Sequence, residues 1–162
     1  MSLNTVNVVN KPLYIFDLDG TLSLAHHRQP ILENKDDPHR WDRFYEACDK
    51  DEPNFPVIRV MHQLRYFGEV WIFSGRSSRV RAKTIAWLSH HTSFAPWELE
   101  TALRMRDEGD HTADDILKKQ WLDSMLVDDR QRLAATFDDR DRVVKMWREN
   151  GITCFQVAPG AF

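Results

Sequence analysis

Acidic side chains follow two short apolar stretches in this 162-residue chain. Asp17 and Asp19 come directly after the first of these stretches, and Asp138 and Asp139 come directly after a later one. Four carboxylates in one place repel one another and raise each other's pKa unless a cation lies among them. Mg²⁺ prefers oxygen ligands and keeps waters, which leaves room for a phosphate oxygen. We therefore expect a magnesium site formed by these four aspartates.

The same residue types are suited to phosphoryl transfer. A carboxylate such as Asp17 can attack phosphorus and form an aspartyl-phosphate. A neighbouring carboxyl such as Asp19 can protonate the leaving oxygen and later deprotonate the hydrolytic water. Hydroxyl and cationic groups are needed to hold the phosphate oxygens as their charge is redistributed. Ser74 and Arg76, which follow another apolar stretch, and Lys118 are the candidates for that role.

Two of these candidates have close competitors. The Asp-Asp-Arg sequence at 138–140 is repeated at 128–130, but the earlier copy follows an amphipathic stretch rather than a strand. We interpret that copy as a solvated loop. Lys118 is favoured over its neighbour Lys119 because it lies four residues after Asp114, one helical turn away on the same face, where the two can form an ion pair.

The elements that must position these residues follow from the apolar pattern. Short continuous apolar runs are typical of strands covered on both faces. They predict strands at 13–16, 70–73, 133–137 and 152–157, with a weaker one at 102–105. Apolar residues at helical spacing predict helices near 57–67, 80–88, 117–125 and 143–147. This alternation predicts an α/β fold with a doubly wound, Rossmann-like parallel sheet, in which ligands bind at the carboxyl ends of the strands.

Residues 22–55 interrupt the alternation. The stretch is polar and rich in His, Asp and Pro, with one amphipathic piece at Trp41, Phe44 and Tyr45. Connections this long are uncommon unless they form a lid or a binding element. We expect a single domain over residues 1–162, with a small cap insertion at approximately 22–55.

The six tryptophans raise the question of stacking with nucleic-acid bases. Four of them lie at apolar-periodic positions, where packing in the core is the better explanation. Trp41 and Trp97 remain as the two candidates for contact with a base.

Composition and charge exclude several classes of protein and indicate a compartment. Hydrophobic residues make up 42% and charged residues 29% of the chain, which excludes a disordered protein. The net charge of −3 argues against a protein that coats nucleic acid by charge alone. Cys48 and Cys154 are interpreted as core residues in a reducing compartment. Because no apolar run is long enough to cross a bilayer and the first dozen residues lack a secretory signal, we expect a cytoplasmic protein with no membrane contact.

The sequence Asp-Leu-Asp-Gly-Thr at 17–21 resembles the signature of the haloacid dehalogenase superfamily of phosphohydrolases. A narrower resemblance, to the 3′-phosphatase domain of the bacteriophage polynucleotide kinase family, covers most of the chain. It is carried by residues 137–147 with Gly151, Gln156-Val157-Ala158 and Phe162, by residues 109–118, and by Ser74-Gly75-Arg76. Residues 22–55 match only loosely, at Arg28.

The resemblance implies an activity and a set of site residues. Family members hydrolyse 3′-phosphates on nucleic-acid ends, and related nucleotide phosphates, with magnesium. The family's active-site positions fall on Asp17, Asp19, Arg28, Ser74, Arg76, Arg106, Asp114, Lys118, Asp138 and Asp139. Among these, the substrate-binding positions are Arg28, Arg76, Arg106 and Asp114. If the chain is phage-encoded, the expected compartment is the host cytoplasm.

The sequence leaves alternatives open. No Gly-x-x-x-x-Gly-Lys-Ser/Thr motif occurs, so we expect no kinase activity from this chain. Any kinase or ligase step would then belong to a separate partner. One rival function is a phosphatase for free nucleotides or another small phosphoester. The other is a non-catalytic scaffold of the same fold, which the intact acidic set argues against.

Overall fold

The computed structural model describes residues 11–160, so Phe162 of the family resemblance lies outside the described residues. Five strands form the central sheet: β1 (Leu13–Phe16), β4 (Glu69–Ser77), β5 (Leu103–Arg106), β6 (Leu133–Asp138) and β7 (Cys154–Gln156). All four pairings are parallel, in the order β5-β4-β1-β6-β7. The five strands that the sequence predicts, including the weaker one at 102–105, are confirmed.

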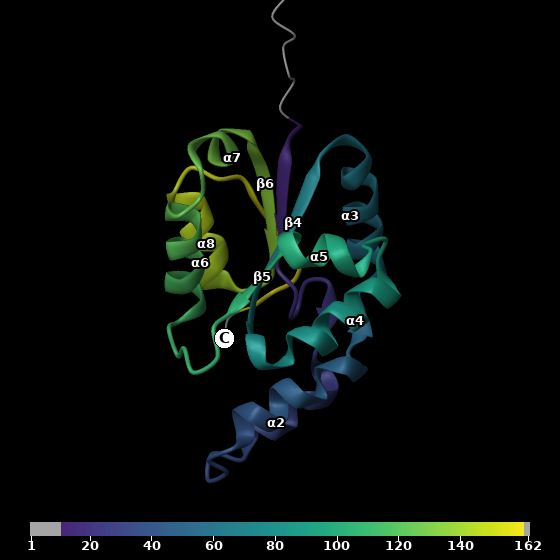
Figure 1. Cartoon of the computed structure of the whole chain (residues 1–162). Coiled ribbons are helices and arrows are strands. Elements are labelled where there is room, and N and C mark those ends of the chain that lie inside the picture. Colours follow the sequence, from purple (N-terminus) through teal and green to yellow (C-terminus); the bar gives the residue numbers. More distant parts are fainter. Residues whose placement is uncertain (1–10, 161–162) are drawn as a thin grey trace, which may run out of the picture.

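Helices cover both faces of the sheet (Figure 1). One face carries α3 (Phe55–Phe67), α4 (Arg81–His91) and α5 (Pro96–Ala102), with the short η3 (Ser78–Val80) before α4. The other face carries α6 (Asp114–Asp123) and α8 (Asp141–Glu149). The doubly wound α/β architecture is therefore confirmed.

Side-chain alternation along β1 explains the two layers. Successive side chains of a strand point to opposite faces of the sheet. Leu13 and Ile15 pack in the cluster with α6 and α8, whereas Phe16 is buried in the cluster with α3 and α4. Both faces of the strand are thus apolar, which is why the sequence shows a continuous apolar run rather than alternation.

Two short helices were not expected from the sequence. Only Leu99 of α5 is buried, and α7 (Val127–Arg132) buries no residue, so neither has a long apolar pattern. The interpretation of 128–130 as a loop is wrong, because these residues lie in α7. They are nevertheless away from the sheet's carboxyl edge, and Asp129 is paired with Arg132 at 2.7 Å.

Between β1 and α3 the chain forms a small separate layer. Its elements are β2 (Ser23–Leu24), η1 (His26–Arg28), α1 (Gln29–Glu33), α2 (Arg40–Glu46), η2 (Ala47–Lys50) and β3 (Glu52–Pro53). β2 and β3 pair antiparallel. In Figure 1, α2 lies beyond the carboxyl ends of the strands, at the lower end of the view. Among the described residues, none of the helices has the length and apolar character to span a membrane.

Candidate active site

Three aspartates meet where β1 and β6 end. β1 and β6 are neighbours, and the backbone N–H of Asp17 donates to the carbonyl of Phe137 at 2.9 Å. Asp17, Asp138 and Asp139 each offer a carboxylate oxygen, and these atoms lie within 4.8 Å of one another. All three residues are buried. The strand pairing therefore brings together acids that are more than 120 positions apart in sequence.

Lys118 projects from α6 into this cluster. Its ammonium group donates to Asp17 at 2.6 Å and to Asp138 at 2.7 Å, and the residue is buried. The expected ion pair with Asp114 is not the one observed, because Lys118 pairs with Asp17 and Asp138. The neighbouring Lys119 is partly exposed and pairs with Asp123 at the helix surface.

The charges of the cluster shift the pKa values of its members. Burial, together with the neighbouring Asp138 and Asp139, raises the pKa of Asp17 well above its ordinary value despite Lys118. Burial and Asp138 raise the pKa of Asp139 to about 6. Burial alone would lower the pKa of Lys118, but Asp138 and Asp17 outweigh it and hold this pKa above its usual value. The ammonium group therefore stays charged, and the cluster keeps an excess of negative charge.

This excess fits a bound divalent cation. The donor atoms are carboxylate oxygens only, which are the ligands that Mg²⁺ prefers. A cation among them would relieve the repulsion that raises the pKa values of Asp17 and Asp139. The three residues that would hold the ion are Asp17, Asp138 and Asp139.

A glycine makes room for this cluster. Gly20 has φ +91°, in the left-handed region that favours glycine. A Cβ atom at this position would lie 2.1 Å from Oδ2 of Asp139. The turn after β1 therefore needs glycine both for its backbone conformation and for the close approach of Asp139.

Asp19 is oriented differently from the sequence expectation. Its carboxylate is not one of the three in the acidic cluster; it accepts hydrogen bonds from Arg28 at 2.5 Å and from Arg76 at 2.5 Å. Burial would raise the pKa of Asp19, but Arg76 and Arg28 outweigh it and hold this pKa well below its ordinary value. Two guanidinium groups thus occupy the carboxylate oxygens of Asp19, and the expectation that Asp19 is a metal ligand stays a prediction.

Arg28 and Arg76 are themselves held by a buried acid. Both are fully buried, and Asp51 accepts from Arg28 at 2.7 and 2.8 Å and from Arg76 at 2.5 Å. Neither arginine lines the pocket described below, and their expected part in substrate binding stays a prediction. Their guanidinium groups are instead committed to Asp19 and Asp51. Two arginines and two aspartates thus form a charge-balanced network behind the acidic cluster.

Ser74 also lies behind the pocket wall. It is fully buried within β4, and its hydroxyl oxygen accepts from the backbone N–H of Arg76 at 3.2 Å. β4 extends to Ser77, so Ser74 lies inside the strand rather than after it. Gly75 and Ser77 are the residues of this strand that line the pocket.

The two remaining sequence candidates lie at the pocket and bind each other. Arg106 at the end of β5 forms an ion pair with Asp114 at the start of α6, and its Nε donates to the carbonyl of Gly75 at 2.8 Å. Asp114 also pairs with Arg140. This cluster joins three separate elements at the same edge of the sheet.

One large pocket contains these groups. Its volume is about 1240 Å³, and its lining includes Asp17, Asp19, Lys118, Asp138 and Asp139. Residues of the 22–55 segment, among them the side chains of α2, form another wall. The acidic cluster, the cap segment and the carboxyl ends of the strands therefore face one space.

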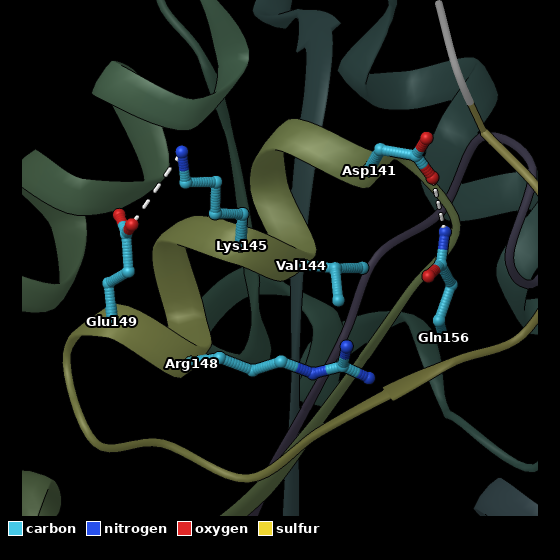
Figure 2. A pocket seen from close by; sticks show the side chains of 6 residues that line it. All are labelled: Asp141, Val144, Lys145, Arg148, Glu149 and Gln156. Atoms are coloured by element: carbon cyan, nitrogen blue, oxygen red, sulfur yellow. Dashed lines mark hydrogen bonds and ion pairs between the residues drawn. The ribbon is translucent and has the colours of Figure 1, made fainter.

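A second pocket, of about 400 Å³, lies between α8 and β7 (Figure 2). Lys145 is paired with Glu149, and Gln156 donates to Asp141 at 2.6 Å. Arg148 donates to the carbonyl of Cys154 at 3.0 Å. The polar side chains of this second pocket thus bind neighbouring groups of the chain. None of the residues that line it belongs to the acidic cluster.

Sequence reasoning missed Asp51. It lies in the polar 22–55 segment among several other acids, and nothing in the residue pattern distinguishes it from Asp49 two positions earlier. Only the folding of the cap segment, which brings Asp51 against Arg28 and against Arg76 of β4, identifies it. Arg140 was visible in the Asp-Asp-Arg sequence but was not assigned a role.

Comparison with known proteins identifies the family. A model of the "Polynucleotide kinase PNKP phosphatase domain" matches residues 11–162. A structure titled "Structure of the Pnkp1/Rnl/Hen1 RNA repair complex" contains a chain with 33% identity and a TM-score of 0.71, and the match covers 94% of this chain and 44% of that one. The present chain thus spans less than half the length of that relative.

Two phosphatase structures share the fold at low identity. The class C acid phosphatase from Bacillus anthracis matches with 14% identity and a TM-score of 0.60, over 96% of this chain and 69% of that one. A putative phosphatase from Clostridium difficile matches with 12% identity and a TM-score of 0.61, over 91% and 85%. With the family match and the five-stranded sheet, these findings establish that the chain belongs to the polynucleotide kinase phosphatase domains of the haloacid dehalogenase superfamily, a family of phosphatases.

Proposed function

We propose that this chain is a magnesium-dependent phosphomonoesterase that removes 3′-phosphates from nucleic-acid ends or nucleotides through an aspartyl-phosphate on Asp17. The observation that carries the proposal is the buried cluster of Asp17, Asp138 and Asp139 with Lys118 at hydrogen-bond distance. The family match supports phosphate-ester hydrolysis. The RNA repair complex that contains a relative supports nucleic-acid ends as substrates, and a separate kinase or ligase as a partner.

The proposed reaction has two displacement steps. A carboxylate oxygen of Asp17 attacks phosphorus, the bond from phosphorus to the 3′-oxygen breaks, and that oxygen takes a proton from the carboxyl of Asp19. Water then attacks the aspartyl-phosphate and releases phosphate, and Asp19 takes up the proton of that water. Asp17, Asp138 and Asp139 would hold Mg²⁺, which when bound would supply positive charge to the phosphate oxygens, and Lys118 binds one of these oxygens.

Arg28 and Arg76 constrain the part played by Asp19. They hold its pKa well below its ordinary value, so its carboxyl is ionised in the free site. An ionised carboxylate suits the second step, in which a base is required. The first step requires Asp19 to leave the two guanidinium groups and take up a proton once the ester is bound. Arg28, Arg76 and Asp51 are therefore positioning residues in this proposal, and Arg106 with Asp114 shapes the opposite side of the phosphate site.

A phosphate-release panel tests the function. Oligonucleotides with 3′-phosphate, 5′-phosphate and 2′,3′-cyclic phosphate ends, and nucleoside 3′-monophosphates, are assayed with Mg²⁺ and with a chelator. We expect magnesium-dependent release from 3′-phosphates, no release from 5′-phosphates, and none from any ester by Asp17→Asn. Faster release from mononucleotides than from oligonucleotide ends favours the free-nucleotide alternative. Absence of release from every ester favours the scaffold and overturns the proposal.

A further inference from the structure

Helix α2 of the cap presents aromatic side chains to the pocket that contains Asp17. Trp41, Phe44 and Tyr45 all line this space. Phe44 is buried, whereas Trp41 is 48% exposed. A large aromatic side chain that faces a polar cavity without being buried has an apolar face available for a ligand. Nothing in the phosphoryl-transfer scheme uses that face.

The rings around Trp41 fix its position. The ring of Phe44 lies edge-on to that of Trp41, with centroids 5.8 Å apart and an interplanar angle of 79°. Tyr45 flanks Trp41 with centroids 6.0 Å apart. Edge-to-face and tilted arrangements at these distances are favourable for aromatic pairs. Phe44 and Tyr45 therefore pack against Trp41, while about half of its side chain stays exposed.

The support is connected to the catalytic groups. The guanidinium carbon of Arg28 lies 4.1 Å from the centroid of the Phe44 ring, at the distance of a cation–π contact. The same guanidinium donates to Asp19. Through Phe44, the aromatic side chains of α2 therefore contact the network that holds Asp19. The distance between these side chains and the phosphate site is thus fixed by packed residues.

Ion pairs also attach α2 to neighbouring elements. Asp42 pairs with Arg79 at 2.5 Å, and Glu46 pairs with Lys83 at 2.9 Å. These contacts attach the helix to η3 and α4, which pack on the sheet. A helix held by such contacts loses little conformational freedom when a ligand binds.

We infer that Trp41 is a stacking platform for the base of the nucleoside that carries the scissile phosphate. The inference rests on the proposed function and names the residue that would contact the base of its substrate. The pocket volume of about 1240 Å³ exceeds the range of roughly 300–1,000 Å³ of most small-molecule sites, so it has room for more than a phosphate group. Stacking is tolerant of sequence because every base has a π-face. The platform therefore favours a nucleoside over a simple alkyl phosphate without selecting among the bases.

Two oligonucleotides test the platform. They carry the same 3′-phosphate and differ only in the terminal nucleoside, which has a base in one and is abasic in the other. For the wild-type chain we expect kcat/KM to be about tenfold higher with the base, mainly through KM, as expected for one stacked base. In Trp41→Ala this ratio falls close to one, and in Trp41→Phe most of it is kept.

Trp97 provides the matched control. It is an exposed tryptophan on α5 that does not line the pocket, so Trp97→Ala keeps the wild-type ratio. A wild-type ratio of one overturns the inference, and so does an unchanged ratio in Trp41→Ala. Because each comparison is a ratio within one protein preparation, a general loss of folded protein does not imitate the result.

A binding measurement separates this inference from the proposed function. Thymidine 3′-phosphate is titrated into Asp17→Asn, and quenching of tryptophan fluorescence is recorded. We expect quenching that is lost when Trp41→Phe is added and that inorganic phosphate alone does not produce. If the wild-type chain hydrolyses no ester, the proposed function fails, but this quenching still supports the platform. Equal quenching with and without Trp41 contradicts it.

Discussion

Asp17 lies in a cluster where three carboxylates face the ammonium group of Lys118. Replacing Asp17 by Asn removes the proposed nucleophile and one of the repelling charges while keeping nearly the same shape. We expect phosphate release to fall at least about a thousandfold, since loss of a nucleophile commonly has such an effect. Thermal unfolding should remain cooperative. The control is Asp128→Asn in the Asp-Asp-Arg sequence at 128–130, and this variant should hydrolyse the ester at the wild-type rate. Substantial turnover by Asp17→Asn contradicts the assignment.

The raised pKa of Asp139 predicts how the free energy of unfolding changes with pH. Its pKa is raised from 3.8 to about 6 by burial and by Asp138. Between these two pH values the folded chain binds more protons than the unfolded chain, so the contribution of this carboxyl to the free energy of unfolding falls as pH rises. Mg²⁺ binds the ionised form, so stabilisation by the ion should appear as pH passes about 6.

Thermal unfolding with and without Mg²⁺ measures this effect. The melting temperature should rise on adding Mg²⁺ at about one pH unit above the pKa of Asp139, and much less at about one unit below it. In Asp139→Asn the rise in melting temperature on adding Mg²⁺ should no longer differ between the two pH values. Equal stabilisation by Mg²⁺ at both pH values in the wild-type chain contradicts the assignment of Asp139 to the metal site.

Residue-level geometry was only partly predictable from the sequence. The periodicity of the helix distinguishes Lys118 from Lys119, and the structure places Lys118 against the acids and Lys119 at the surface. The direction of the Asp19 side chain was not predictable. It depends on Arg28 and Asp51, which lie in the cap segment, and their burial is a tertiary effect that no local spacing reports.

At the scale of elements, the turn after β1 decides how closely Asp139 approaches. Gly20→Ala places a Cβ in the left-handed region and against the carboxylate of Asp139. We expect a loss of about 1–2 kcal/mol of stability from the backbone alone. Hydrolysis should fall by about a hundredfold, because small displacements at a reacting centre are costly. Denaturant melts and phosphate release measure the two effects.

Gly151, which follows α8, is the matched control for this turn. It has φ +77°, but a Cβ there would meet nothing within 4 Å. Gly151→Ala should lose a similar amount of stability and keep its activity. Wild-type hydrolysis by Gly20→Ala contradicts the account of this turn.

Element boundaries were predictable where a long apolar pattern exists. β1, β4, β6 and α3 follow from continuous or helical apolar runs, and α3 ends at Phe67, directly before Gly68. α5 and α7 have almost no buried side chains, so they lack that pattern. In the cap only α2 was visible, as the amphipathic piece at Trp41, Phe44 and Tyr45. The other cap elements have no repeating apolar face that the sequence could show.

At the scale of the whole molecule, strand order produces the candidate site. β1 lies between β4 and β6, so the ends of three separate strands converge on one pocket. The alternation of strands and helices predicts this convergence, since parallel strands share a carboxyl edge. The second wall of the pocket comes from the cap, whose sequence resembles the family only loosely. We therefore expect the cap to be the part in which substrate selection differs between this chain and other members of the family.

The stereochemical course at phosphorus tests the central claim most directly. A 3′-phosphorothioate ester made chiral at phosphorus with two oxygen isotopes is hydrolysed by the wild-type chain with Mg²⁺ in water that carries the third isotope, and the configuration of the thiophosphate product is determined. Attack by Asp17 followed by attack of water gives two in-line displacements, so the account predicts net retention. Net inversion would mean a single attack by water on the ester and would contradict Asp17 as the nucleophile.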